Sequence, residues 1–144
     1  MNSPRCILST IESDSHMWNL IYLELLLEEE GWTVANLGCC VPPQELEDAI
    51  RTETPDLVVV STINGSGAIQ GLELIRGLRE RLGAALPPVV IGGRLTTAVE
   101  ADADAAAALR VAGYAAVCIG PPAISEFCEL LRTLAPQHLP ALVS

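Results

Sequence analysis

A short polar segment near the N-terminus contains the residues best suited to chemistry. His16 is one of only two histidines in the chain, and Asp14 lies two positions before it. A carboxylate that accepts the Nδ1 proton of an imidazole fixes the tautomer and orientation of the ring, and it leaves Nε2 free for a metal or a proton. The plainer interpretation is that Asp14 caps the following helix and that His16 is a solvated residue of its first turn. On these two residues alone, the plainer interpretation is favoured.

Two further segments carry residues that a ligand could use. The residues Ser61-Thr62-Ile63-Asn64-Gly65 end one very apolar run, and Gly92-Gly93 follow another. Serine at the end of a strand is commonly a turn residue or a helix cap. Asn64-Gly65-Ser66-Gly67 resembles a phosphate cradle, but it lacks the lysine and the spacing of a nucleotide-binding loop. The glycine pair suits either an ordinary tight turn or a ligand that approaches the backbone closely.

Alternating strands and helices must position these segments. Apolar runs predict strands at residues 5–10, 32–37, 56–61, 88–91 and 115–119, with helices at 17–30, 42–51, 68–82, 97–112 and 123–134. The run Leu57-Val58-Val59-Val60 is typical of a strand buried on both faces. The alternation predicts an α/β fold, a doubly wound five-stranded parallel sheet in three layers, α/β/α. Right-handed crossovers favour the flavodoxin-like (Rossmann-like) strand order 2-1-3-4-5.

This topology brings the polar segments together. In doubly wound sheets, ligands bind beyond the carboxyl ends of the strands, near the switch point between strands 1 and 3. Residues 13–16 follow the first predicted strand, residues 61–65 end the third, and residues 92–94 follow the fourth. All three segments are therefore expected at one edge of the sheet. Their combination favours a binding site over the plainer interpretation of each segment alone.

Composition narrows the classes of function. A chain of 144 residues fits a single domain, which we place at 1–135, followed by a C-terminal tail at 136–144. The net charge of −10 would repel a phosphate backbone, so we expect no nucleic-acid partner. No run approaches the roughly 18 apolar residues of a membrane span, and no signal peptide is readable. The five cysteines lack the spacing of a disulfide framework or a zinc cluster, so we expect a cytoplasmic, reduced protein.

Together the three segments resemble the motif of a known family. The chain is identified as a member of the cobalamin-binding domain family, whose pattern is Asp-x-His-x-x-Gly, then Ser-x-Leu, then Gly-Gly. This sequence has Asp14-Ser15-His16-Met17-Trp18-Asn19, Ser61-Thr62-Ile63 and Gly92-Gly93, at the intervals the family shows. Ile63 in place of leucine is nearly neutral in volume. Asn19 in place of glycine adds a side chain that faces the corrin or its tail, where it either occupies space or contributes a hydrogen bond.

The resemblance implies a role for each motif residue. His16 would be the lower axial ligand of cobalt in place of the cofactor's dimethylbenzimidazole, and Asp14 would tune its basicity. Ser61 would hydrogen-bond a nitrogen of the displaced base, and the glycine pair would let the nucleotide tail pass close to the backbone. Residues 13–17 would lie beneath the corrin, and residues 93–97 would line the tail slot. The expected cofactor-binding residues are Ser13, Asp14, Ser15, His16, Met17, Ser61, Thr62, Ile63, Gly92, Gly93, Arg94, Leu95, Thr96 and Thr97, with His16 as the metal ligand.

Within that family, the chain is most similar to the free-standing small subunit of glutamate mutase (methylaspartate mutase). The resemblance implies a subunit of an adenosylcobalamin-dependent isomerase, with no catalytic residue of its own, that provides the cofactor socket. The enzyme would convert L-glutamate to threo-3-methylaspartate by radical rearrangement. A large TIM-barrel subunit would bind the amino-acid substrate and join this chain in a heterotetramer-like assembly.

Two alternatives belong to other classes of function. A corrinoid carrier for methyl transfer would use the same cofactor with a separate methyltransferase. A relative that has lost cobalamin would instead serve as a response-regulator-like interaction module. An acidic receiver needs clustered aspartates at the ends of strands 1 and 3, and this sequence offers only Asp14, beside Glu12. The receiver interpretation is therefore the weakest of the three.

Overall fold

A five-stranded parallel sheet forms the centre of the protein. The computed structural model describes residues 3–134. Its strands pair in parallel in the order β2-β1-β3-β4-β5, which confirms the predicted topology. The strands are β1 (Arg5–Ser9), β2 (Thr33–Asn36), β3 (Leu57–Thr62), β4 (Val89–Gly93) and β5 (Ala116–Ile119).

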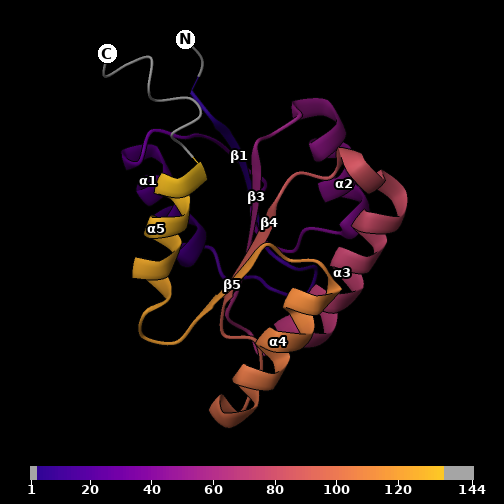
Figure 1. Cartoon of the computed structure of the whole chain (residues 1–144), viewed down its shortest axis with the longest axis vertical. Coiled ribbons are helices and arrows are strands. Elements are labelled where there is room, and N and C mark those ends of the chain that lie inside the picture. The colour runs from indigo at the N-terminus through magenta and orange to yellow at the C-terminus, as the bar shows by residue number, and fades with distance from the viewer. Residues whose placement is uncertain (1–2, 135–144) are drawn as a thin grey trace.

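Helices cover both faces of the sheet, as Figure 1 shows. One face is covered by α1 (Trp18–Glu29) and α5 (Ala123–Leu134), and the other by α2 (Pro43–Glu53), α3 (Gly67–Leu82) and α4 (Asp102–Ala112). Because successive strand residues point to opposite faces, the apolar strands feed two separate cores. Val58 and Val60 pack toward α2, α3 and α4, whereas Leu57 and Val59 pack toward α1 and α5. The expected three-layer architecture is thus confirmed.

Two element boundaries near the predicted site differ from the sequence-based expectation. β4 does not stop at Ile91, because Gly92 and Gly93 continue its pairing with the last residues of β3. α4 begins at Asp102, after a short 3₁₀ turn, and not at residue 97. The intervening loop is anchored by the buried Leu95, whose carbonyl accepts a hydrogen bond (2.9 Å) from a backbone amide in α3. The burial of Leu95 and its hydrogen bond outweigh the helical preference of the alanine-rich sequence.

The first helix is apolar on both of its faces. Leu20, Leu23 and Leu27 face the core, while Trp18 is 83% exposed and Tyr22 is also exposed on the outer surface. The first two turns of α1 therefore lack the polar outer face that is typical of a surface helix, and the exposed Glu28 and Glu29 follow only in its last turn.

The described helices are short. The longest, α3, has 16 residues, below the roughly 20 that span a bilayer. Within residues 3–134 no helix combines the length and apolar character of a membrane span. The expected tail at 136–144 and the last residue of the expected domain lie outside the described part of the chain.

Candidate cofactor site

The loops that follow β1, β3 and β4 meet at the carboxyl edge of the sheet, as the topology predicts. Asp14, from the loop after β1, accepts hydrogen bonds from Thr62 and Ile63 at the end of β3. The backbone N–H of Arg94, just after β4, donates to the carbonyl oxygen of Thr62 at 2.8 Å. Three segments that lie far apart in the sequence therefore form one surface.

Asp14 is the fixed centre of this edge. Its side chain is buried, and each carboxylate oxygen has two partners. Oδ1 accepts the backbone N–H of His16 at 2.9 Å and lies 2.7 Å from His16 Nδ1. Oδ2 accepts the Thr62 hydroxyl and the Ile63 backbone N–H, both at 2.8 Å. Burial of the carboxyl group raises its pKa, but the four hydrogen bonds outweigh burial and hold the pKa of Asp14 below its ordinary value.

The ionised Asp14 fixes the chemistry of His16. A carboxylate can only accept hydrogen bonds, so Nδ1 of His16 carries a hydrogen, and in the neutral imidazole this tautomer leaves the lone pair on Nε2. The His16 side chain is half exposed, and within residues 3–134 its Nε2 atom has no hydrogen-bond partner. The capping interpretation of Asp14 is wrong, because α1 has Met17 at its N-cap and no side-chain capping bond. The arrangement is an oriented imidazole whose Nε2 could hold a metal.

A network of neutral polar side chains supports this centre. Asn64 donates to the hydroxyl of Ser13 at 2.9 Å, and that hydroxyl donates to Gln70 Oε1, also at 2.9 Å. Asn64 Oδ1 accepts the backbone N–H of Ser66 at 2.9 Å, so it closes the turn into α3. Gln70 lies on α3, and no local pattern in the sequence connects it with residues 13–16.

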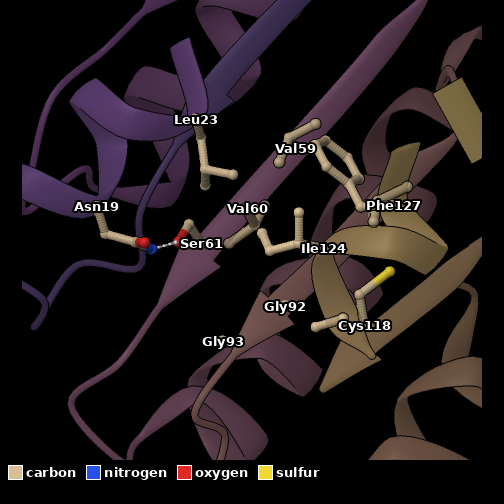
Figure 2. A pocket seen from close by; sticks show the side chains of 12 residues that line it. Asn19, Leu23, Val59, Val60, Ser61, Gly92, Gly93, Cys118, Ile124 and Phe127 are labelled. Carbon is tan, nitrogen blue, oxygen red and sulfur yellow. Dashed lines mark hydrogen bonds between the residues drawn. The ribbon is translucent and has the colours of Figure 1, made fainter. Parts of the chain in front are cut away.

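An apolar slot opens beside the same edge, between the sheet and helices α1 and α5 (Figure 2). It has a volume of about 100 Å³. Ser61, Gly92 and Gly93 of the predicted site border it, and Asn19 hydrogen-bonds Ser61 at its side. The complete lining is Asn19, Leu23, Val59, Val60, Ser61, Val90, Gly92, Gly93, Cys118, Ala123, Ile124 and Phe127.

Several lining residues were not expected from the sequence. Leu23 and Phe127 follow the helical spacing of core residues, and nothing in that spacing indicates that they border a cavity. Conversely, residues 94–97 do not line this slot. Leu95 is buried in the core on the α2–α4 side, and Thr96 bonds the carboxylate of Asp102 at 2.6 Å. Ser15, Met17, Arg94 and Thr97 are exposed near the edge, and their contact with a cofactor stays a prediction.

The glycine pair is required by the sheet itself. A Cβ atom on Gly92 would lie 2.7 Å from the carbonyl oxygen of Cys118 on β5. On Gly93, where φ is +110°, it would lie 2.0 Å from the carbonyl oxygen of Thr62 on β3. These contacts are with neighbouring backbone and not with the slot. The two glycines therefore let β4 pack closely against its neighbouring strands. They lie at the end of β4 itself and not in a separate turn.

Fold and site together define a class of protein. This is a doubly wound α/β domain with one carboxylate-oriented histidine at its carboxyl edge and a narrow apolar slot beside it. Residues 4–120 match the family model described as the B12 binding domain. The chain belongs to the B12-binding domain family, as its motif residues indicated.

Curated relatives carry a more specific name. The chain is similar to the "Glutamate mutase sigma subunit" of Halobacterium salinarum, with 34% identity over 94 residues, which is 64% of this chain and 60% of the relative. It is also similar to the "Glutamate mutase sigma subunit" of Escherichia coli O157:H7, with 28% identity over 136 residues, 91% of this chain and 87% of the relative.

Solved structures confirm the fold. A cobalamin-binding protein from Desulfitobacterium hafniense superposes with a TM-score of 0.71 at 18% identity, over 91% of this chain and 58% of that one. The methanol:cobalamin methyltransferase complex of Methanosarcina barkeri gives a TM-score of 0.66 at 17% identity, over 94% of this chain and 48% of that one. A LuxR-family response regulator from Aurantimonas gives a TM-score of 0.63 at 21% identity, over 94% of this chain and 87% of that one. At these identities the likeness extends to the fold alone.

Proposed function

We propose that this chain is the cobalamin-binding small subunit of an adenosylcobalamin-dependent carbon-skeleton mutase of the glutamate mutase (methylaspartate mutase) type. The observation that carries the proposal is His16, with Nδ1 held by the buried Asp14 and Nε2 without a protein partner. Membership of the B12-binding family and the relatives named glutamate mutase sigma subunit support the same function.

The residues present fit the cofactor. His16 would hold cobalt through Nε2, while Asp14 retains the hydrogen on Nδ1 and keeps the ring from rotating. The displaced dimethylbenzimidazole tail would enter the apolar slot, where Ser61 is the polar group for its nitrogen. The loop of residues 13–17 would lie beneath the corrin. Adenosylcobalamin, when bound, would supply radical chemistry, whereas the chain would supply binding and orientation.

The openness of the site supports the proposal of a second subunit. The side chain of His16 is half exposed, so residues 3–134 leave its ring partly open to solvent. Radical chemistry requires water and side reactants to be excluded. We infer that a large TIM-barrel subunit closes over this edge in a heterotetramer-like assembly and binds the amino-acid substrate, L-glutamate, for conversion to threo-3-methylaspartate.

The cobalt ligand can be tested by electron paramagnetic resonance of the cob(II)alamin complex. Protein labelled with nitrogen-15 should change the superhyperfine splitting, because the axial nitrogen would come from His16. The same measurement on His16→Ala, with the same label, should show no protein nitrogen. Splitting that is identical in labelled and unlabelled wild-type protein would contradict the proposal.

The reaction can be tested with the candidate large subunit. The chain alone should convert no L-glutamate, and turnover should require the partner and adenosylcobalamin together. Assembly without glutamate turnover would keep the mutase class and change the substrate. The alternative function, a corrinoid carrier, would instead show methyl transfer from methylcobalamin in the presence of a methyltransferase and no rearrangement.

A further inference from the structure

Asn19 makes a contact that the family motif does not include. It lies in the first turn of α1, at the position where the family pattern has glycine. Figure 2 shows its side chain extending along the slot toward Ser61. Its amide Nδ2 donates a hydrogen bond to the Ser61 hydroxyl oxygen. Asn19 is therefore in contact with the one hydroxyl group that the described residues place at the border of the slot.

This bond determines what the Ser61 hydroxyl can offer. A serine hydroxyl has one hydrogen to donate and two lone pairs to accept with. The amide of Asn19 occupies one lone pair. Within residues 3–134, no acceptor for the Ser61 hydrogen is present, although the residue is only 4% exposed. A buried donor without a partner is costly, so this hydrogen favours an acceptor inside the slot.

The surroundings of Ser61 are otherwise apolar. Leu23, Val59 and Phe127 approach the slot from α1, β3 and α5 and offer no acceptor side chain (Figure 2). A slot with apolar walls and one directed donor suits a flat heteroaromatic ring whose nitrogen has a free lone pair. A ring of the same shape without such a nitrogen would leave the donor unsatisfied.

We propose that Asn19 is a positioning residue that dedicates the Ser61 hydroxyl hydrogen to a ring nitrogen of the ligand in this slot. The inference rests on the proposed function, because there the ligand is the base at the end of the cobalamin tail. Without the amide of Asn19, the hydroxyl can rotate and present a lone pair as readily as its hydrogen. Asn19 thus makes the slot selective for bases with an unprotonated nitrogen.

Two substitutions of Asn19 separate this role from a simple space-filling one. Asn19→Asp keeps the shape of the side chain but replaces the donor with an acceptor. The carboxylate would take the Ser61 hydrogen and turn its lone pairs toward the ring nitrogen. Asn19→Gly restores the family pattern and frees the hydroxyl. Ser61→Ala removes the group on which Asn19 acts.

Titration calorimetry should be carried out with cobalamin and with cobinamide, the corrinoid that lacks the nucleotide tail. We expect Asn19→Asp to weaken cobalamin binding about 10- to 100-fold and Asn19→Gly only about 2- to 10-fold. Ser61→Ala should lose about 10-fold, and the Asn19→Asp change should have no further effect in that background. Cobinamide affinity should stay unchanged in all variants, which also controls for the added charge of Asp.

The outcomes distinguish the inference from the proposed function. Equal cobalamin affinity for wild type, Asn19→Asp and Asn19→Gly would overturn the role of Asn19 and leave cobalamin binding intact. A parallel loss for cobalamin and cobinamide would also overturn it, because the effect would then not pass through the tail. Absence of binding of either corrinoid to the wild-type chain would overturn both. Unfolding midpoints of all variants, measured without ligand, show whether a loss reflects misfolding.

Discussion

At the scale of single residues, the site depends on a buried charge. Ionised Asp14 is stable in the interior only because two side chains and two backbone amides donate to it. The same bonds join the loop after β1 to the end of β3 and hold the ring of His16. One carboxylate therefore serves both the local fold and the orientation of the imidazole.

Replacing Asp14 should damage cofactor binding through His16. We expect Asp14→Ala to lower cobalamin affinity or mutase activity by about 10- to 100-fold, the usual effect of removing the partner of a metal-binding histidine. His16→Ala should have a larger effect. Calorimetric titration with cobalamin measures both. An Asp14→Ala variant that binds and turns over like the wild type would show that the pairing is unimportant.

The lowered pKa of Asp14 predicts a pH dependence of stability. In the unfolded chain this carboxyl group titrates near its ordinary pKa of 3.8, so between that value and the lower native pKa the unfolded state binds more protons. The contribution of Asp14 is therefore complete above about pH 4 and is lost as the pH falls through the native pKa. Urea unfolding of wild type and Asp14→Asn should show a stability difference at pH 7 that shrinks toward pH 3. A constant difference would contradict this assignment.

At the scale of elements, the end of β4 sets a strict steric limit. Gly93 combines a φ of +110° with a 2.0 Å approach of its missing Cβ to Thr62. We expect Gly93→Ala to destabilise the protein by about 2–5 kcal/mol, since backbone strain and overpacking act together. A valine at position 93 would clash with the backbone of Thr62 in β3, so its effect on ligand binding could not be separated from its effect on the sheet.

Gly31 offers a matched control for that change. Its φ is +94°, but no atom lies within 4 Å of the position where a Cβ would be. Gly31→Ala should therefore cost only the backbone strain, about 1–2 kcal/mol. Equal losses in denaturant unfolding for the two variants would show that the contact with Thr62 is not what matters at Gly93.

Substitution of the two tryptophans should change the free energy of unfolding by very different amounts. Trp32 is 3% exposed, and its indole N–H has no partner within residues 3–134, whereas Trp18 is largely exposed. Trp32→Ala should cost about 3–5 kcal/mol, but Trp32→Phe less than about 1.5 kcal/mol, because it also removes an unsatisfied donor. Trp18→Ala should stay within about 0.5 kcal/mol. Urea unfolding gives all three values, and a large loss for Trp32→Phe would indicate a hidden partner.

At the scale of the whole molecule, the sequence was sufficient for the topology. Long apolar runs indicate buried strands, and the regular alternation of strands and helices, with right-handed crossovers, limits the possible strand orders. The strand order and the meeting of three loops at one edge could therefore be predicted. The lining of the slot by Leu23 and Phe127 could not, because helical spacing reports burial and not the presence of a cavity. Neither could the hydrogen bond that the Ser13 hydroxyl donates to Gln70, which depends on the placement of α3 against a distant loop.

Ligand binding should be visible in the stability of the whole domain. The slot is bordered by the sheet, α1 and α5, so a bound tail would contact elements from both halves of the chain. At a cobalamin concentration of about 100 times Kd, the native state should gain about 2.7 kcal/mol. Cobinamide, which leaves the slot empty, should give a smaller rise in Tm at equal concentration. Equal rises in Tm at equal concentration of the two corrinoids would show that the tail contributes nothing.

The strand-to-strand contacts of Gly92 and Gly93 bear on how related genes should be interpreted. A descendant that had lost its cofactor would still need both glycines, because β3 and β5 exclude a side chain there whether or not the slot is used. His16 is less constrained by the fold, since its side chain is half exposed and, within residues 3–134, the hydrogen bond of its ring goes to Asp14. Under the proposed function, selection for cofactor binding would preserve His16. In a newly sequenced homologue, the glycine pair would then report common ancestry, and the histidine would report whether the cofactor is still in use.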